Sequence, residues 1–380
     1  MRVPTIDVSA FVGGEAGVEA RARVVSEVRE ACERVGFFYV ANHGVPPSTL
    51  REAMGSARAF FELPLSAKMA VADLRKGYIP VGGCDNAVRP TSLHEKFSCS
   101  RVDGVDRADP YYGGDDPNAE LYFGEENRWP TEPEGFRAAW EAYYRAMERV
   151  VALLHRVFAE ALDVPEGPEF FARRSRKHVS NLVALRYPPV AVADDGSSAA
   201  PALRVKPHTD PTDVTVLAFE RGPRGLQVLP EGEDEWTDVP PPSVEDALLV
   251  NLGDVLRFWT NDRWQSTRHR VVGSGGDDGE ARAGTGTGMG TGTGTGTGTR
   301  TGTSAASFVD DRMSLVFFHA PDYDARVDCD DVGGAVVGPD RPRRYPPFIC
   351  GERSHFAQLK RNEAGLPDRQ TLGENGERGE

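Results

Sequence analysis

The stretch RVKPHTDPTDVTVL, residues 204–217, places His208 and Asp210 two positions apart at the head of an apolar, β-branched run. Alternate residues of a β-strand point to the same side, so an imidazole and a carboxylate would share one face here. Two such groups can bind a metal ion, although an isolated His-x-Asp is more often an ordinary solvated strand end. The pair therefore predicts a metal site only if another part of the chain supplies a further ligand.

A third candidate ligand opens a later β-rich run, where the segment NDRWQSTRHRVV carries His269. Two histidines and one carboxylate match the facial triad of non-haem Fe(II) oxygenases, which leaves adjacent coordination positions open. A zinc hydrolase can also use two histidines and one aspartate. The spacing of His208, Asp210 and His269 thus favours a metal centre without deciding its chemistry.

A second group of polar residues lies in the run DRMSLVFF, which puts Arg312 and Ser314 on one face of an apolar strand. A buried guanidinium is costly unless it meets an anion, and arginine binds carboxylates in a bidentate manner. Arg312 either pairs with an acidic residue at a strand edge or holds the distal carboxylate of a keto acid on the metal. Tyr187, in LRYPP, is either a hydroxyl donor for the cosubstrate or substrate, or a buried core tyrosine.

The remaining pattern predicts helices in the first part of the chain and strands in the second. Apolar residues recur at helical spacing over 16–35, 47–63, 65–73 and 134–163, and Gly36 ends the first of these segments. From Val179 onward, short β-rich runs, among them ALLVNLGDVLRFW, alternate with turn clusters, which is typical of a barrel or jelly roll.

This pattern also predicts the domain organisation. We expect an N-terminal helical and mixed region over 1–130, a β core over 131–360 and a polar tail over 361–380, all in one compact unit. The segment GTGTGMGTGTGTGTGTRTGT, residues 284–303, has glycine at alternate positions and no phosphate-loop motif. We expect a disordered Gly/Thr-rich insertion over 273–306 in a connection between strands.

Composition narrows the function classes. The net charge of −14 argues against a nucleic-acid or anionic-membrane surface, because both need clustered lysine and arginine. The five cysteines form no CxxC pair, so reduced, incidental thiols are expected. The N-terminus lacks a signal-peptide pattern, and no run approaches the roughly 18 apolar residues of a membrane span. We expect a soluble, cytoplasmic protein that acts on a small molecule and binds neither nucleic acid nor membranes.

Ordered motifs run through nearly the whole chain: VPTIDVSAF, ACERVGFFYVANHGVP, RYPP, HTDPTDVTVL, GLQVL, VNLGDVLRFWTNDRWQSTRHRVV, DRMSLVFF and RYPPFICGER. Together they resemble the isopenicillin N synthase-like family of Fe(II)/2-oxoglutarate-dependent oxygenases. The resemblance implies an α+β fold with a double-stranded β-helix (jelly-roll) core, flanked by N-terminal helices and a long central helix. It assigns Fe(2+) to His208, Asp210 and His269, and 2-oxoglutarate to Arg312, Ser314 and Tyr187.

The function implied by this resemblance is the oxidation, and most simply the hydroxylation, of a small organic molecule such as a specialised metabolite. O2 and 2-oxoglutarate are the cosubstrates, and succinate and CO2 are released. Three alternatives stay open: an oxidase of the same fold that does not use 2-oxoglutarate, a non-catalytic binding protein, and a metal-dependent hydrolase. In the oxidase, Arg312 and Ser314 would hold a carboxylate of the substrate instead.

Two other histidines are expected to lie outside the metal centre. His43, in NHGVP, is predicted to be a structural residue of a turn. His319 lies five positions beyond Ser314, so strand alternation puts it on the opposite face from Arg312 and Ser314.

Overall fold

The computed structural model describes most of the chain outside a few segments. The described residues are 3–13, 17–74, 76–82, 94–106, 108–113, 122–188, 190–191, 203–220, 222–223, 225–273, 308–309, 311–334 and 336–353. The insertion predicted over 273–306, apart from its first residue, and the tail predicted over 361–380 lie outside these residues. Within the described part, no helix is long and apolar enough to cross a membrane.

The larger sheet has eight strands in the order β1-β2-β11-β8-β14-β5-β4-β3. β1 is parallel to β2, and the other neighbours are antiparallel. Strands from the N-terminal region and from the β-rich second part of the chain therefore lie in one sheet. The strand bounds are β1 Thr5–Asp7, β2 Phe37–Ala41, β3 Tyr78–Ile79, β4 Glu95–Cys99, β5 Asn181–Tyr187, β8 Val214–Phe219, β11 Leu248–Leu252 and β14 Arg312–His319.

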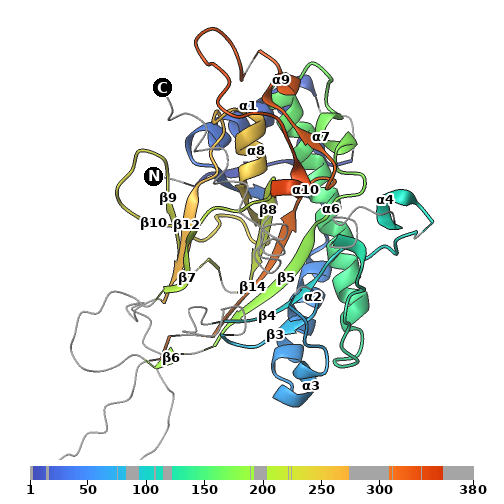
Figure 1. Cartoon of the computed structure of the whole chain (residues 1–380). Helices are drawn as coiled ribbons and strands as arrows, with labels where there is room; N and C mark the ends of the chain where they lie inside the picture. Colours follow the sequence, from blue (N-terminus) through green and yellow to red (C-terminus); the bar gives the residue numbers. More distant parts are fainter. Residues whose placement is uncertain are drawn as a thin grey trace, which may run out of the picture.

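The smaller sheet has the order β10-β9-β12-β7 and is antiparallel. It lies on one side of the larger sheet, with the long helix α6 on the other side (Figure 1). Its register pairs His269 with His208, and this pairing becomes irregular towards the start of β7. The bounds are β7 Leu203–His208, β9 Leu226–Leu229, β10 Thr237–Asp238 and β12 Arg268–Val272, and two further strand pairs are β6 Val190–Ala191 with β13 Phe308–Val309 and β15 Arg326–Val327 with β16 Phe348–Ile349.

The helices gather on the outer face of the larger sheet. α6 (Phe136–Ala161) contacts β8 and β14, and α1 (Val18–Arg34) and α2 (Pro47–Phe61) pack on α6 (Figure 1). Gly36, at φ +67°, donates its N–H to the carbonyl of Ala31 and ends α1 as predicted. The shorter helices are η1 Ser9–Phe11, α3 Leu65–Met69, α4 Pro110–Gly113, α7 Phe170–Arg173, α8 Asp254–Trp259, α9 Cys329–Val332 and α10 Cys350–Arg353.

The larger sheet is covered on both faces. On β2, Phe38 and Val40 belong to the main core beneath the helices, whereas Phe37 and Tyr39 belong to a second cluster between the two sheets. Because alternate residues of one strand lie in different clusters, both faces of the sheet are buried. The second cluster also contains Tyr187, Leu226, Val228, Leu249 and Val271, so it joins the two sheets into the jelly-roll core.

One segment differs from the prediction. The run ALLVNLGDVLRFW was expected to be β-rich throughout, but β11 ends at Leu252 and α8 follows. A Cβ on Gly253 would lie 2.0 Å from the carbonyl oxygen of Thr212, so the chain turns here against the loop that carries Asp210. The N–H groups of Asp254 and Val255 donate to the carbonyls of Asp210 (2.8 Å) and Thr212 (3.0 Å). The first turn of α8 therefore supports this loop.

Candidate metal centre and cosubstrate site

The three predicted metal ligands converge at one end of the smaller sheet. Their ligand atoms lie within 4.8 Å of one another. The Nε2 atoms of His208 and His269 lie 3.7 Å and 3.6 Å from Oδ1 of Asp210. These distances are too long for good hydrogen bonds. They suit a shared ion, because metal–ligand bonds of roughly 2.0–2.2 Å place two ligands of one ion at most about 4.4 Å apart.

Backbone carbonyls orient both imidazoles. Nδ1 of His208 lies 2.8 Å from the carbonyl oxygen of Lys206, and Nδ1 of His269 lies 3.1 Å from that of Thr267. A carbonyl can only accept, so each Nδ1 carries the proton and each Nε2 keeps its lone pair. Burial lowers the pKa of His269, which keeps its ring neutral. Both rings are thus prepared to bind a cation through Nε2.

Asp210 is oriented by two neighbours in the larger sheet. Its buried Oδ2 accepts hydrogen bonds from Oγ1 of Thr215 (2.6 Å) and Nδ2 of Asn251 (2.7 Å). Burial disfavours the carboxylate, but the electrostatic interactions with the rings of His269 and His208 and these hydrogen bonds outweigh it and lower the pKa of Asp210. Oδ1 is left to face the histidines. No role of Thr215 or Asn251 was predicted from the sequence, where the available signal was a polar residue inside each apolar strand.

The cluster is open on one side. The side chain of His208 is 41% exposed, whereas that of Asp210 is 3% exposed. Ligands gathered on one side of an ion, with access from the other, are what a facial triad requires for exogenous ligands. The donor set of two neutral imidazoles and one carboxylate therefore fits Fe(II).

A second His–Asp–His cluster lies behind this loop and differs in its geometry. Asp213 accepts hydrogen bonds from Nε2 of His155 on α6 (2.9 Å) and from Nδ1 of His319 on β14 (2.7 Å). All three side chains are buried, and the imidazoles bond directly to the carboxylate. This closed cluster fixes the loop after Asp210 against α6 and β14.

The positions of the two excluded histidines match the predictions. His319 lies on the helix-covered side of the larger sheet, against His155, and not with Arg312. His43 contacts the carbonyl of Asp246 through Nε2 (2.9 Å) and accepts from the N–H of Val45 through Nδ1 (3.2 Å). It is a structural histidine.

The residues predicted to bind 2-oxoglutarate also come together. Arg312 opens β14, which lies between β8 and β5, so it is not on an edge strand. It pairs across the sheet with Tyr187, and its Cζ lies 5.0 Å from the centroid of that ring. Burial lowers the pKa of Arg312, although a guanidinium stays charged. Ser314 is buried two residues further along the same strand. The three residues form a polar site on the larger sheet.

The sequence matches two protein-family models. Residues 3–132 match the N-terminal region of non-haem dioxygenases of the morphine-synthesis type, and residues 179–283 match the 2OG-Fe(II) oxygenase superfamily. The validamycin A dioxygenase of Streptomyces hygroscopicus subsp. limoneus is 33% identical over 277 residues, which cover 71% of each chain. The chain belongs to the 2OG-Fe(II) oxygenase superfamily.

Other relatives agree with this oxygenase family. The 2-oxoglutarate-dependent dioxygenase thnC of Trichoderma harzianum is 31% identical over 280 residues, covering 71% of this chain and 79% of that protein. A putative 2OG-Fe(II) oxygenase from Caulobacter crescentus superposes with a TM-score of 0.68 at 22% identity and covers 95% of this chain and 99% of that chain. The dioxygenase for auxin oxidation in rice has a TM-score of 0.62 at 24% identity, covering 98% of each chain. These two structures confirm the predicted fold.

The family relationship also confirms the predicted enzyme class. The protein is a dioxygenase that uses Fe(II), 2-oxoglutarate and O2 to oxidise a small organic molecule. The hydrolase, the non-catalytic binding protein and the oxidase without 2-oxoglutarate are thereby set aside. The individual residue assignments stay predictions.

Proposed function

We propose that His208, Asp210 and His269 bind Fe(II), that Arg312, Ser314 and Tyr187 bind 2-oxoglutarate, and that the enzyme hydroxylates a small organic molecule. The observation that carries the proposal is the orientation of the triad. Both Nε2 atoms face the same oxygen of Asp210 at 3.6–3.7 Å, and the exposed side of His208 leaves access for further ligands.

Bound iron would supply the redox chemistry with O2 as the oxidant: oxidative decarboxylation of 2-oxoglutarate would take one oxygen atom of O2 into succinate, release CO2 and leave the other oxygen atom for the substrate. The chain supplies orientation. The histidines donate lone pairs, and Asp210 supplies negative charge while Thr215 and Asn251 hold its other oxygen. Arg312 and Ser314 hold the distal carboxylate of the keto acid.

The apolar side chains around the cosubstrate site also have a role in the proposed reaction. The apolar cluster between the sheets, which includes Tyr187 and Leu249, surrounds the cosubstrate site with buried side chains. Its part in the proposed reaction is to exclude water from the reacting atoms.

We extend the proposal to substrate and location. The similarity to the validamycin A dioxygenase and to the fungal 2-oxoglutarate-dependent dioxygenase thnC supports a specialised metabolite as the substrate. The net charge of −14 supports a protein that binds neither nucleic acid nor anionic membranes. Free, buried cysteines such as Cys32 and Cys99 support the cytoplasm as its location, because thiols stay reduced there. The pairing of β2 with β11 and of β4 with β5 supports one compact unit spanning the predicted N-terminal and core regions.

The experiment is an anaerobic titration of the metal-free protein with Fe(II) and then 2-oxoglutarate, followed through the visible iron-to-keto-acid charge-transfer band. We expect the band in the native protein and in the control Arg51→Ala, which changes an exposed residue of α2. Arg312→Ala should lose the band or need far more 2-oxoglutarate to form it, because the distal carboxylate loses its charged partner. A native protein that binds iron without the band, or an Arg312→Ala variant of native affinity, would contradict the assignment.

A further inference from the structure

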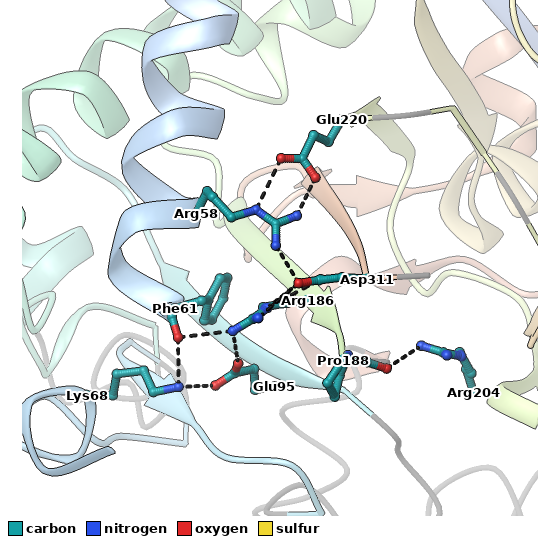
Figure 2. A network of polar contacts seen from close by, with 9 residues as sticks. All are labelled: Arg58, Phe61, Lys68, Glu95, Arg186, Pro188, Arg204, Glu220 and Asp311. Atoms are coloured by element: carbon teal, nitrogen blue, oxygen red, sulfur yellow. Dashed lines mark hydrogen bonds and ion pairs between the residues drawn. The ribbon is translucent and has the colours of Figure 1, made fainter. Parts of the chain in front are cut away.

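Arg204 on β7 is a buried cation that the proposed reaction does not yet use. Arg204 is only 3% exposed. Nη1 donates to the carbonyl of Pro188 at 3.2 Å, and Nη2 has no hydrogen-bond partner among the described residues (Figure 2). Burying a guanidinium without an anion is strongly unfavourable. A negatively charged ligand beside Arg204 would therefore lower the free-energy cost of burying its guanidinium.

The nearby arginines on the helix-covered side show the contrast. Arg58 of α2 pairs with Glu220, and it also lies 2.7 Å from Asp311 (Figure 2). Arg186 of β5 lies 2.9 Å from Asp311 and 3.2 Å from Glu95. Glu220, Asp311 and Glu95 thus already pair with arginines on the helix-covered face of the larger sheet.

The pKa values differ between the arginines that pair with carboxylates and Arg204. Burial alone would lower the pKa of Arg58 and Arg186, but the carboxylates of Glu220 and Asp311 outweigh it and raise both pKa values. Burial lowers the pKa of Arg204, and its acidic neighbourhood does not offset this. The charge of Arg204 in turn adds to the burial that lowers the pKa of Arg312. An anion beside Arg204 would offset the burial of its charge.

The two guanidinium groups reach the same side chain from opposite sheets. Cζ of Arg204 lies 5.9 Å from the centroid of the Tyr187 ring, and Cζ of Arg312 lies 5.0 Å from it. Arg204 lies between Leu203 and Val205, where the register of β7 with β12 is irregular. Such irregularities redirect side chains, which is consistent with the approach of Arg204 to Tyr187 on β5.

We infer that Arg204 is a second binding group for the distal carboxylate of 2-oxoglutarate, which it shares with Arg312. This inference rests on the proposed placement of that carboxylate at Arg312 and adds a residue from the smaller sheet. Two guanidinium groups around one carboxylate would compensate the buried charge of Arg204. The site would then favour a dicarboxylic keto acid strongly over a monocarboxylic one.

The test compares two keto acids in the anaerobic, Fe(II)-loaded protein. 2-Oxopentanoate has the chain length of 2-oxoglutarate with a methyl group in place of the distal carboxylate. The Kd of each is measured from the charge-transfer band in the native protein, Arg204→Gln, Arg204→Lys and the control Arg51→Gln, which removes an exposed charge from α2.

Arg204→Gln should raise the Kd of 2-oxoglutarate by about 10- to 100-fold, the effect of losing one charged hydrogen-bonding partner. The Kd of 2-oxopentanoate should not change. Arg204→Lys should give an intermediate Kd for 2-oxoglutarate, because it keeps the charge without the planar fork. Arg51→Gln should leave both Kd values unchanged.

Two results would overturn the inference. One is a native Kd for 2-oxoglutarate in folded Arg204→Gln and Arg204→Lys, with the thermal midpoint as the check of folding. The other is an equal loss of affinity for both keto acids, which would indicate general damage to the site. Arg312→Ala, measured alongside, separates the proposals: if it alone weakens 2-oxoglutarate binding, only the role of Arg204 is wrong. A native protein without the band would contradict the proposed function itself.

Discussion

The metal ligands are oriented by the residues that hydrogen-bond to them. Asp210 presents one oxygen to His208 and His269 because Thr215 and Asn251 hold the other. Thr215 and Asn251 are direct cross-strand partners on β8 and β11. Partners that fix a ligand in this way usually contribute measurably to metal affinity.

Replacing Thr215 with valine tests this role at constant volume. Thr215→Val removes the 2.6 Å hydrogen bond to Asp210 and should weaken Fe(II) binding by about 10-fold or more, with the fold retained. Fe(II) affinity is measured by anaerobic titration. The matched control Thr260→Val removes a buried hydroxyl at the end of α8 that donates to the carbonyl of Leu256 and accepts from the N–H of Trp264, and it should leave the Fe(II) affinity unchanged. Equal affinities in native protein and Thr215→Val would contradict the role.

For single residues, the sequence indicates which side chains can bind a metal ion, but it does not indicate which residues hydrogen-bond to those ligands. His208, Asp210 and His269 could be found because their chemistry and spacing suffice to suggest a metal. Thr215, Asn251 and Arg204 could not, because their roles depend on which distant strands lie next to one another. Asn251 meets Thr215 only through the register of β11 with β8.

The secondary-structure elements could be predicted where apolar residues repeat at regular spacing and bury one face of the segment. The helices expected over 16–35 and 134–163 correspond to α1 and α6 because their apolar residues repeat at helical spacing and pack on the core. The run containing Asp254–Trp259 was misjudged. Its first helical N–H groups bond to carbonyls of the loop after His208, a tertiary contact that no local pattern reveals.

The buried cluster of His155, Asp213 and His319 joins α6 and β14 to the loop after Asp210. Burial lowers the pKa of His319 to about 4 from an ordinary value of 6.5. Between these values the unfolded chain binds a proton that the folded chain does not. The free energy of unfolding should therefore fall as the pH drops from about 6.5 towards 4, by an amount on the order of 3 kcal/mol.

Denaturant unfolding at several pH values checks this prediction. The comparison is His319→Gln, whose amide can still donate to Asp213 but cannot take up a proton in this range. The difference in unfolding free energy between native protein and variant should shrink or reverse as the pH falls. Parallel curves from pH 6.5 to 4 would contradict a buried, neutral His319.

For the whole molecule, the class of fold could be predicted but the arrangement of strands could not. Many short strands between turns are typical of a jelly roll. The order of the larger sheet depends on contacts between distant segments, such as Phe37 with Asn251. That sheet separates the open triad and the closed cluster of Asp213, which lie on opposite faces.

The central claim is that iron binds at the open cluster and not at the closed one. Anaerobic Fe(II) binding and iron content are measured in the native protein, His208→Gln and His155→Gln. His208 is the exposed ligand of the triad, and His155 is the matched histidine hydrogen-bonded to Asp213. Native protein and His155→Gln should bind one iron per chain, and His208→Gln should lose it while staying folded. Iron retained at native affinity by His208→Gln and lost from folded His155→Gln would contradict the claim.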